Sequence, residues 1–188
     1  MEHTKRLVIV PAFNEENVIA ETLRRLRREG DDFDLLVVDD GSSDRTLQIA
    51  LDSGEIVLPC EVNGGYESAL IRGFDYFKSK GYESFVVVDA DGEIDPCKAI
   101  SYLRQICVST PLFCGFRTTP KRISEKLGAY VVYKLSGIRD IFCGCKGFHI
   151  SIIGEIDSVN LSRNTFTYAA IELSKSNRVL DGDVSGSR

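Results

Sequence analysis

Short apolar runs alternate along this chain with segments in which apolar residues recur at a helical period. Largely apolar runs, typical of strands buried on both faces of a parallel sheet, are found at residues 6–10 (RLVIV), 33–38 (FDLLVV) and 85–88 (FVVV). Shorter strands are predicted at 55–58, 112–116 and 179–180. The alternation of strands with helical segments predicts an α/β fold with a mainly parallel sheet.

The helices are predicted from apolar spacing and from capping residues at their starts. They are expected from Glu15, with Asn14 as the cap; from Ser42 or Ser43 to Ala50; after Asn63-Gly64-Gly65; from Pro96 to about Cys107; from Lys121 to Leu135; and from Phe166 to Ser174. Residues 140–149 are expected to form a loop that leads into a last strand or helix. No repeat or interdomain linker is found, so residues 1–188 are expected to form one domain.

The central feature is the stretch FVVVDADGEIDP, in which an apolar strand runs directly into an acidic turn. Residues i and i+2 of an extended chain point to the same side, so Asp89 and Asp91 can converge on one point beyond the sheet. Carboxylate oxygens in this arrangement suit Mg²⁺ or Mn²⁺, with water and phosphate oxygens completing the coordination. The sequence therefore predicts a divalent cation site here.

Two other strands also end in polar turns, at PAFNEE and DDGSSD. Ligands of parallel sheets bind beyond the carboxyl ends of the strands, so these turns are expected to meet the DADGE turn at one edge. The glycine-rich start of the next helix, at Gly64 and Gly65, is a weak candidate for holding phosphate.

The acidic turn also resembles other kinds of site. A calcium-binding EF-hand loop is excluded, because that loop has glycine at its sixth position and here Gly92 stands at the fourth. A haloacid-dehalogenase-type phosphatase, with Asp89 as nucleophile and Asp91 as acid/base, leaves PAFNEE and DDGSSD unexplained. An acidic loop that only closes a strand is the simplest alternative.

Composition narrows the class of protein. The chain has 188 residues, 43% of them hydrophobic and 27% charged, which is ordinary for a globular domain. A net charge of −5 argues against nucleic-acid binding. No apolar run approaches the roughly 20 residues that span a bilayer, and no secretory signal is found. The six cysteines are therefore expected to be reduced thiols of a cytoplasmic protein.

Taken together and in order, PAFNEE, DDGSSDRT, NGGYESALIRGF, DADGEIDP, GFR and the CG-x-KGF element resemble glycosyltransferase family 2 domains of the GT-A fold. The resemblance covers nearly the whole chain, and it is greatest to the dolichyl- and polyprenyl-phosphate mannose and glucose synthases. It implies a Rossmann-like three-layer α/β/α sandwich. It also implies an inverting hexosyl transfer from a UDP- or GDP-sugar to an acceptor, with a polyprenyl or dolichyl phosphate as the expected acceptor.

The resemblance assigns roles to particular residues. The positions implied to contact the nucleotide or its cation are Pro11, Ala12, Asn14, Glu15, Asp39, Asp40, Gly41, Asp89, Ala90 and Asp91. Asp89 and Asp91 are the implied ligands of Mg²⁺ or Mn²⁺. The positions implied in catalysis are Asp91, Arg117, Arg122 and Asp140.

The nature of the acceptor changes what these residues must do. A hydroxyl acceptor needs a general base, for which Asp140 is the candidate. A phosphate acceptor is already anionic and needs cations instead, which suits Lys121 and Arg122. A saccharide acceptor in cell-envelope glycan synthesis and a non-catalytic nucleotide-sugar-binding protein are the alternatives.

The chain also departs from the family pattern. Phe142 stands where relatives have a polar residue, and DGDV replaces a Glu-Val-Pro-Ile element near the end. Peripheral contact with the cytosolic face of a membrane is left open, because a lipid acceptor would be met there. The arginines around Leu26 are better explained by the dipole at the end of their helix.

Overall fold

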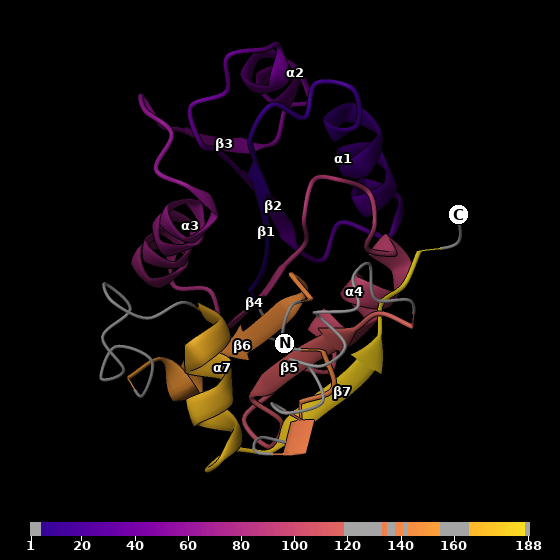
Figure 1. Cartoon of the computed structure of the whole chain (residues 1–188), viewed down its shortest axis with the longest axis vertical. Helices are drawn as coiled ribbons and strands as arrows, with labels where there is room; N and C mark the ends of the chain where they lie inside the picture. The colour runs from indigo at the N-terminus through magenta and orange to yellow at the C-terminus, as the bar shows by residue number, and fades with distance from the viewer. Residues whose placement is uncertain (1–4, 119–132, 135–137, 141–142, 155–165, 187–188) are drawn as a thin grey trace.

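The computed structural model describes residues 5–118, 133–134, 138–140, 143–154 and 166–186. A single seven-stranded sheet organises these residues, with strand order β3-β2-β1-β4-β6-β5-β7 (Figure 1). The strands are β1 (Arg6–Ala12), β2 (Asp34–Asp39), β3 (Ile56–Pro59), β4 (Ser84–Val87), β5 (Leu112–Phe116), β6 (Lys146–His149) and β7 (Val179–Asp183). Only β6 runs antiparallel to its neighbours, β4 and β5. The predicted mainly parallel sheet is confirmed.

Helices cover both faces of the sheet (Figure 1). One face is covered by α1 (Ile19–Arg28), α2 (Thr46–Asp52) and α4 (Pro96–Leu103), whose apolar residues pack with Val8, Val10 and Leu35. The other face is covered by α3 (Tyr66–Lys80) and α7 (Phe166–Ser174), which pack with Leu7 and Ile9. Because successive strand residues point to opposite faces, the sheet carries two cores. The three-layer α/β/α sandwich is confirmed.

Aromatic packing fixes α3 against the middle of the sheet. The ring of Phe85 on β4 lies 4.8 Å from that of Phe77 on α3 and 5.3 Å from that of Phe148 on β6, measured between centroids. Gly73 lets α3 approach β1, because a Cβ there would lie 2.7 Å from Ile9 Cγ2. This packing places the first residue of α3 at the edge where β1 and β4 end.

The start of the first helix differs from the sequence prediction. The helix begins at Ile19 rather than Glu15, and Asn14 does not cap it. Asn14 instead adopts a left-handed backbone with φ 55°, and its Oδ1 accepts a hydrogen bond from Ser43 N. A long-range contact between two loops has replaced the local cap.

Two other helices also differ from the sequence prediction. Neither Ser42 nor Ser43 caps α2; Asp44 Oδ1 accepts a hydrogen bond from the Thr46 N–H at its start. The helix from Pro96 begins where predicted, with Asp95 accepting a hydrogen bond from Cys97 N, but it ends at Leu103, short of Cys107.

Part of the stretch predicted as a loop, Lys146–His149, is strand β6. The last strand continues to Asp183, beyond the predicted pair of residues, because β5 pairs with it along its length. The helix predicted over 121–135 lies outside the described residues, apart from helical Tyr133 and Lys134.

None of the described helices is long and apolar enough to cross a membrane. All six cysteines are free thiols. Cys60, Cys114, Cys143 and Cys145 are buried, and burial raises the pKa of each of these thiols, which keeps them protonated.

Candidate active site

A cavity of about 530 Å³ opens at the carboxyl ends of the parallel strands. It is lined by Pro11, Ala12, Phe13, Glu15, Asp40, Asn63, Gly65, Tyr66, Ala69, Asp89, Ala90 and Asp91. The three polar turns predicted to share one edge therefore do meet. A hollow of about 610 Å³ between α1 and α2 contains none of the predicted site residues.

Asp40 forms the side of the cavity next to α3. Its Oδ1 and Oδ2 accept hydrogen bonds from Gly64 N at 3.0 Å and Gly65 N at 2.7 Å. The two amides that the sequence offered as a phosphate cradle are thus bound by a carboxylate, and that expectation is wrong. Gly41 makes the approach possible, since a Cβ there would lie 2.7 Å from Asn63 N.

Replacing Asp40 with alanine should weaken both the fold and nucleotide binding. Two charge-assisted hydrogen bonds from the Gly64 and Gly65 amides to the buried Asp40 carboxylate would be lost, at a cost of about 1.5–3 kcal/mol each at most. Urea unfolding and titration calorimetry with UDP and GDP measure the two effects. A lower stability with unchanged nucleotide affinity would reduce Asp40 to a cap of α3.

Asp89 is confined from two sides. Tyr66, the first residue of α3, donates a hydrogen bond from its hydroxyl to Asp89 Oδ1 at 2.8 Å. On the other side, a Cβ on Gly144 would lie 1.9 Å from Asp89 Oδ2, so the backbone at Gly144 lies directly against the carboxylate. The orientation of the Asp89 carboxylate is therefore set by α3 and by the loop before β6.

The carboxylates that line the cavity lie close enough to raise the pKa values of their neighbours. Desolvation raises the pKa of Asp89, the hydrogen bond from Tyr66 opposes this, and the charge of Asp91 raises it further. Desolvation and then the charge of Asp91 likewise raise the pKa of Glu15. A bound cation would relieve this repulsion, so the residues are suited to hold Mg²⁺ or Mn²⁺.

The protein alone does not complete such a cation site. Within the described part of the chain, no group of three or more histidine, cysteine, aspartate or glutamate side chains is arranged to hold a metal. The remaining ligands would have to be water and phosphate oxygens, as is usual for Mg²⁺ at nucleotide sites. Cation binding is therefore expected to depend on the nucleotide.

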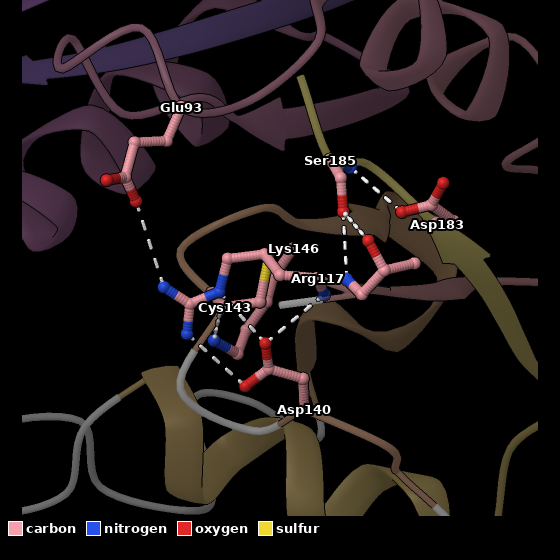
Figure 2. Close-up of polar contacts among 8 residues, drawn as sticks. Glu93, Arg117, Asp140, Cys143, Lys146, Asp183 and Ser185 are labelled. Carbon is pink, nitrogen blue, oxygen red and sulfur yellow. Dashed lines mark hydrogen bonds and ion pairs between the residues drawn. The ribbon is translucent and has the colours of Figure 1, made fainter. Parts of the chain in front are cut away.

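Arg117 and Asp140 lie beside the cavity and do not line it. Arg117 Nε donates to Asp140 Oδ2 at 3.0 Å, and Arg117 Nη1 lies 3.9 Å from Glu93 Oε2 (Figure 2). The side chains of Arg117 and Asp140 are only 15% and 11% exposed. This ion pair joins the end of β5 to the loop before β6 and to the turn that follows Asp91.

The chain beyond β7 braces that same turn. Asp95 N donates to Val184 O at 2.9 Å, and Gly186 N donates to Glu93 O at 3.0 Å. Lys98 Nζ contacts Asp183 Oδ2 at 2.7 Å. We call residues 183–186 the C-terminal brace. Figure 2 shows Ser185 of this brace beside Arg117.

The structure gathers most of the predicted nucleotide and metal positions around one cavity. Of those predicted, the lining residues are Pro11, Ala12, Glu15, Asp40, Asp89, Ala90 and Asp91. Asn14 and Gly41 lie in the supporting loops. Asp39 is the buried last residue of β2, and its Oδ2 accepts a hydrogen bond from Ser42 N. Arg122, with Lys121 and Phe142, lies outside the described residues.

Sequence reasoning missed several residues of the site. Phe13 and Tyr66, residues that are each 44% exposed, line the cavity, and Gly144 contacts Asp89. The position of Tyr66 directly after the glycine turn was a usable signal. Nothing in the sequence placed Gly144 against Asp89, which follows β4 and lies 55 positions earlier in the chain.

Comparison with known proteins decides the family. The model of the family described as glycosyl transferase family 2 matches residues 7–153. The chain belongs to glycosyltransferase family 2. The matched range contains every residue that the sequence proposed for the donor site.

Curated relatives of this family 2 chain include lipid-phosphate glycosyltransferases. The uncharacterized glycosyltransferase YkcC of Bacillus subtilis is 30% identical, over 74% of this chain and 46% of its own. The polyprenol monophosphomannose synthase of Mycolicibacterium smegmatis is 28% identical, over 81% and 64%. The undecaprenyl-phosphate mannosyltransferase of Micrococcus luteus is 34% identical, over 61% and 49%. The match spans about half to two-thirds of the length of these relatives.

Solved structures agree on the fold. Glucosyl-3-phosphoglycerate synthase from Mycobacterium tuberculosis, in complex with Mn²⁺, UDP-glucose and phosphoglyceric acid, superposes with a TM-score of 0.68 at 18% identity. The superposition covers 98% of this chain and 72% of the other. At this identity the similarity shows the shared GT-A fold.

Proposed function

We propose that this domain transfers a hexose from a nucleotide-diphosphate sugar, UDP- or GDP-linked, to a polyprenyl or dolichyl phosphate, with inversion at the anomeric carbon. The observation that carries the proposal is the meeting of Asp40, Asp89 and Asp91 in one cavity at the carboxyl edge of the sheet, within a family 2 fold. In this proposal residues 1–188 act as one catalytic domain.

Different residues of the cavity are proposed to bind the nucleoside and the diphosphate of the donor. Asp40 and the turn at Asn63 form the wall proposed to meet the nucleoside, with the exposed ring of Phe13 nearby. Asp89 and Asp91 are proposed to hold Mg²⁺ or Mn²⁺ on the diphosphate. When bound, this cation offsets the charge that develops on the leaving nucleoside diphosphate.

The ion pair between Arg117 and Asp140 supports the proposal that the acceptor is already charged. Asp140 accepts hydrogen bonds from Arg117, so its carboxylate is engaged in holding that side chain. A phosphate acceptor needs no proton removed, and Asp140 is then a positioning residue rather than a base. The names of the M. smegmatis and M. luteus relatives support the same acceptor class. Lys121 and Arg122 are proposed to bind the acceptor phosphate, which would be reached at the surface of a membrane.

The test is incubation with radiolabelled UDP- and GDP-sugars and either polyprenyl phosphate or a panel of oligosaccharides. Label that partitions into the organic phase supports the proposal. Label found only in water-soluble oligosaccharide would show that the acceptor is a saccharide, and the assignment as a glycosyltransferase would stand. Donor binding with no transfer to either acceptor would favour a nucleotide-sugar-binding protein.

Replacing Asp91 with asparagine should weaken cation-dependent donor binding by at least about tenfold, or about 1.4 kcal/mol. Asp91 is exposed, and its Oδ1 accepts a hydrogen bond from Glu93 N within the same turn, so the fold should survive. Donor affinity is measured with Mn²⁺ and with EDTA. Equal donor affinity of the wild type under both conditions would show that donor binding does not require a metal, and the proposed metal role would fail.

A further inference from the structure

We propose that Tyr66 is a positioning residue for the donor cation: its hydroxyl holds the Asp89 carboxylate in the orientation that the cation requires. This inference rests on the proposed function, because it assumes that Asp89 faces a bound Mg²⁺ or Mn²⁺. Tyr66 was absent from the residues that the motifs predicted.

The contact itself is short and direct. Tyr66 Oη donates to Asp89 Oδ1 at 2.8 Å, and both residues line the donor cavity. A tyrosine side chain has two rotatable torsions to its ring, so its hydroxyl is placed with little loss of conformational entropy. Asp89 stands just beyond the end of β4, where the backbone is no longer held by the sheet.

The opposite side of Asp89 is closed by backbone. Since a Cβ on Gly144 would come within 1.9 Å of Asp89 Oδ2, the carboxylate has no room to rotate toward the loop before β6. With Tyr66 on Oδ1 and Gly144 beside Oδ2, the plane of the carboxylate is fixed from two elements far apart in sequence. Removing the Tyr66 hydroxyl would free one of the two sides.

Tyr66 is itself held firmly. It follows Gly65, whose φ of 85° turns the chain into α3, and the Gly65 N–H is bound by Asp40 at 2.7 Å. Farther along α3, Phe74 and Phe77 are buried in the core. The hydroxyl therefore projects from a helix that is anchored at its start and along its length.

The chemical consequence concerns cation affinity. Carboxylates that bind metals are usually hydrogen-bonded by neighbouring groups, and loss of such a partner typically lowers metal affinity by about 10- to 100-fold. Tyr66→Phe removes only the hydroxyl and keeps the ring. We expect this variant to bind Mn²⁺ about tenfold more weakly in the presence of nucleoside diphosphate.

The experiment is a Mn²⁺ titration followed by the electron paramagnetic resonance signal of the free ion, at saturating UDP and, separately, GDP. The matched control is Tyr82→Phe, which also removes a tyrosine–aspartate hydrogen bond: Tyr82 Oη donates to Asp34 Oδ2 at 2.6 Å, away from the cavity. Tyr82→Phe should bind Mn²⁺ as the wild type does. Circular dichroism establishes that both variants are folded.

The outcomes separate the two proposals. If the wild type binds Mn²⁺ and Tyr66→Phe binds it equally well, the positioning role is overturned and the proposed function stands. If Tyr82→Phe weakens Mn²⁺ binding as much as Tyr66→Phe, the effect reflects stability, and the positioning role is overturned as well. If the wild type binds no Mn²⁺ beside either nucleotide, the metal role in the proposed function fails, and the role of Tyr66 fails with it.

Discussion

Replacing Gly144 with alanine is expected to reduce sugar transfer on the order of 100-fold while the domain still folds. The added Cβ would lie 1.9 Å from Asp89 Oδ2, and real Cβ contacts are essentially never shorter than 3.0 Å, so the carboxylate or the loop must move by more than 1 Å. A displacement of this size at a reacting centre can cost about 100-fold in rate. Overpacking of this kind costs about 1–3 kcal/mol of stability.

The measurement is kcat/KM for transfer together with urea unfolding. Gly154→Ala is the matched control, because a Cβ at Gly154 would meet no other described residue within 4 Å. This control should retain wild-type activity. Wild-type transfer by Gly144→Ala would mean that the loop before β6 shifts without moving Asp89. The close contact between Gly144 and Asp89 would then not be required for activity.

Replacing Arg117 with methionine is expected to lower the free energy of unfolding by about 3–5 kcal/mol, because it leaves the buried Asp140 carboxylate without its guanidinium. Both side chains are largely buried, and Arg117 binds Asp140 through its side chain and its backbone N–H. Transfer should fall as well, since the turn after Asp91 would lose its contact with Arg117.

An exposed arginine–aspartate pair provides the comparison. Arg104 and Asp32 form hydrogen bonds of similar geometry, but their side chains are 40% and 41% exposed. Arg104→Met should therefore cost only about 1 kcal/mol or less. Equal losses of stability in Arg117→Met and Arg104→Met would show that burial does not increase the contribution of Arg117 to the free energy of unfolding. Adding Asp140→Leu to Arg117→Met should restore part of the lost stability, because no charge is then buried alone.

Much of the fold could be predicted from local patterns. The apolar run that ends at Val88 and the acidic turn after it are adjacent in sequence, so the strand and its carboxylates were predicted together. The same holds for β1 with its PAFNEE turn. The buried face of α3 followed the apolar spacing from Ala69 to Phe77.

The missed features depend on partners distant in sequence. Asn14 looks like a helix cap, but Ser43 competes for its side chain from 29 positions away. Asp40 looks like a free carboxylate, but the turn at Gly64 and Gly65 binds it. The antiparallel strand β6 lies between β4 and β5, and nothing in its four residues specifies those neighbours. Tertiary contacts decided these points, and apolar periodicity carries no information on them.

The C-terminal brace bears on how the protein is made. Lys98, just after the donor turn, contacts Asp183, which is 85 positions later in the chain. During synthesis β1, β2 and β4 emerge early, and their acidic turns can approach one another long before residues 183–186 leave the ribosome. For much of its translation, the nascent domain would thus contain the carboxylates of the donor site without the contacts that residues 183–186 make to the turn after Asp91. Competence for donor binding should appear late and abruptly, as the last strand docks on β5.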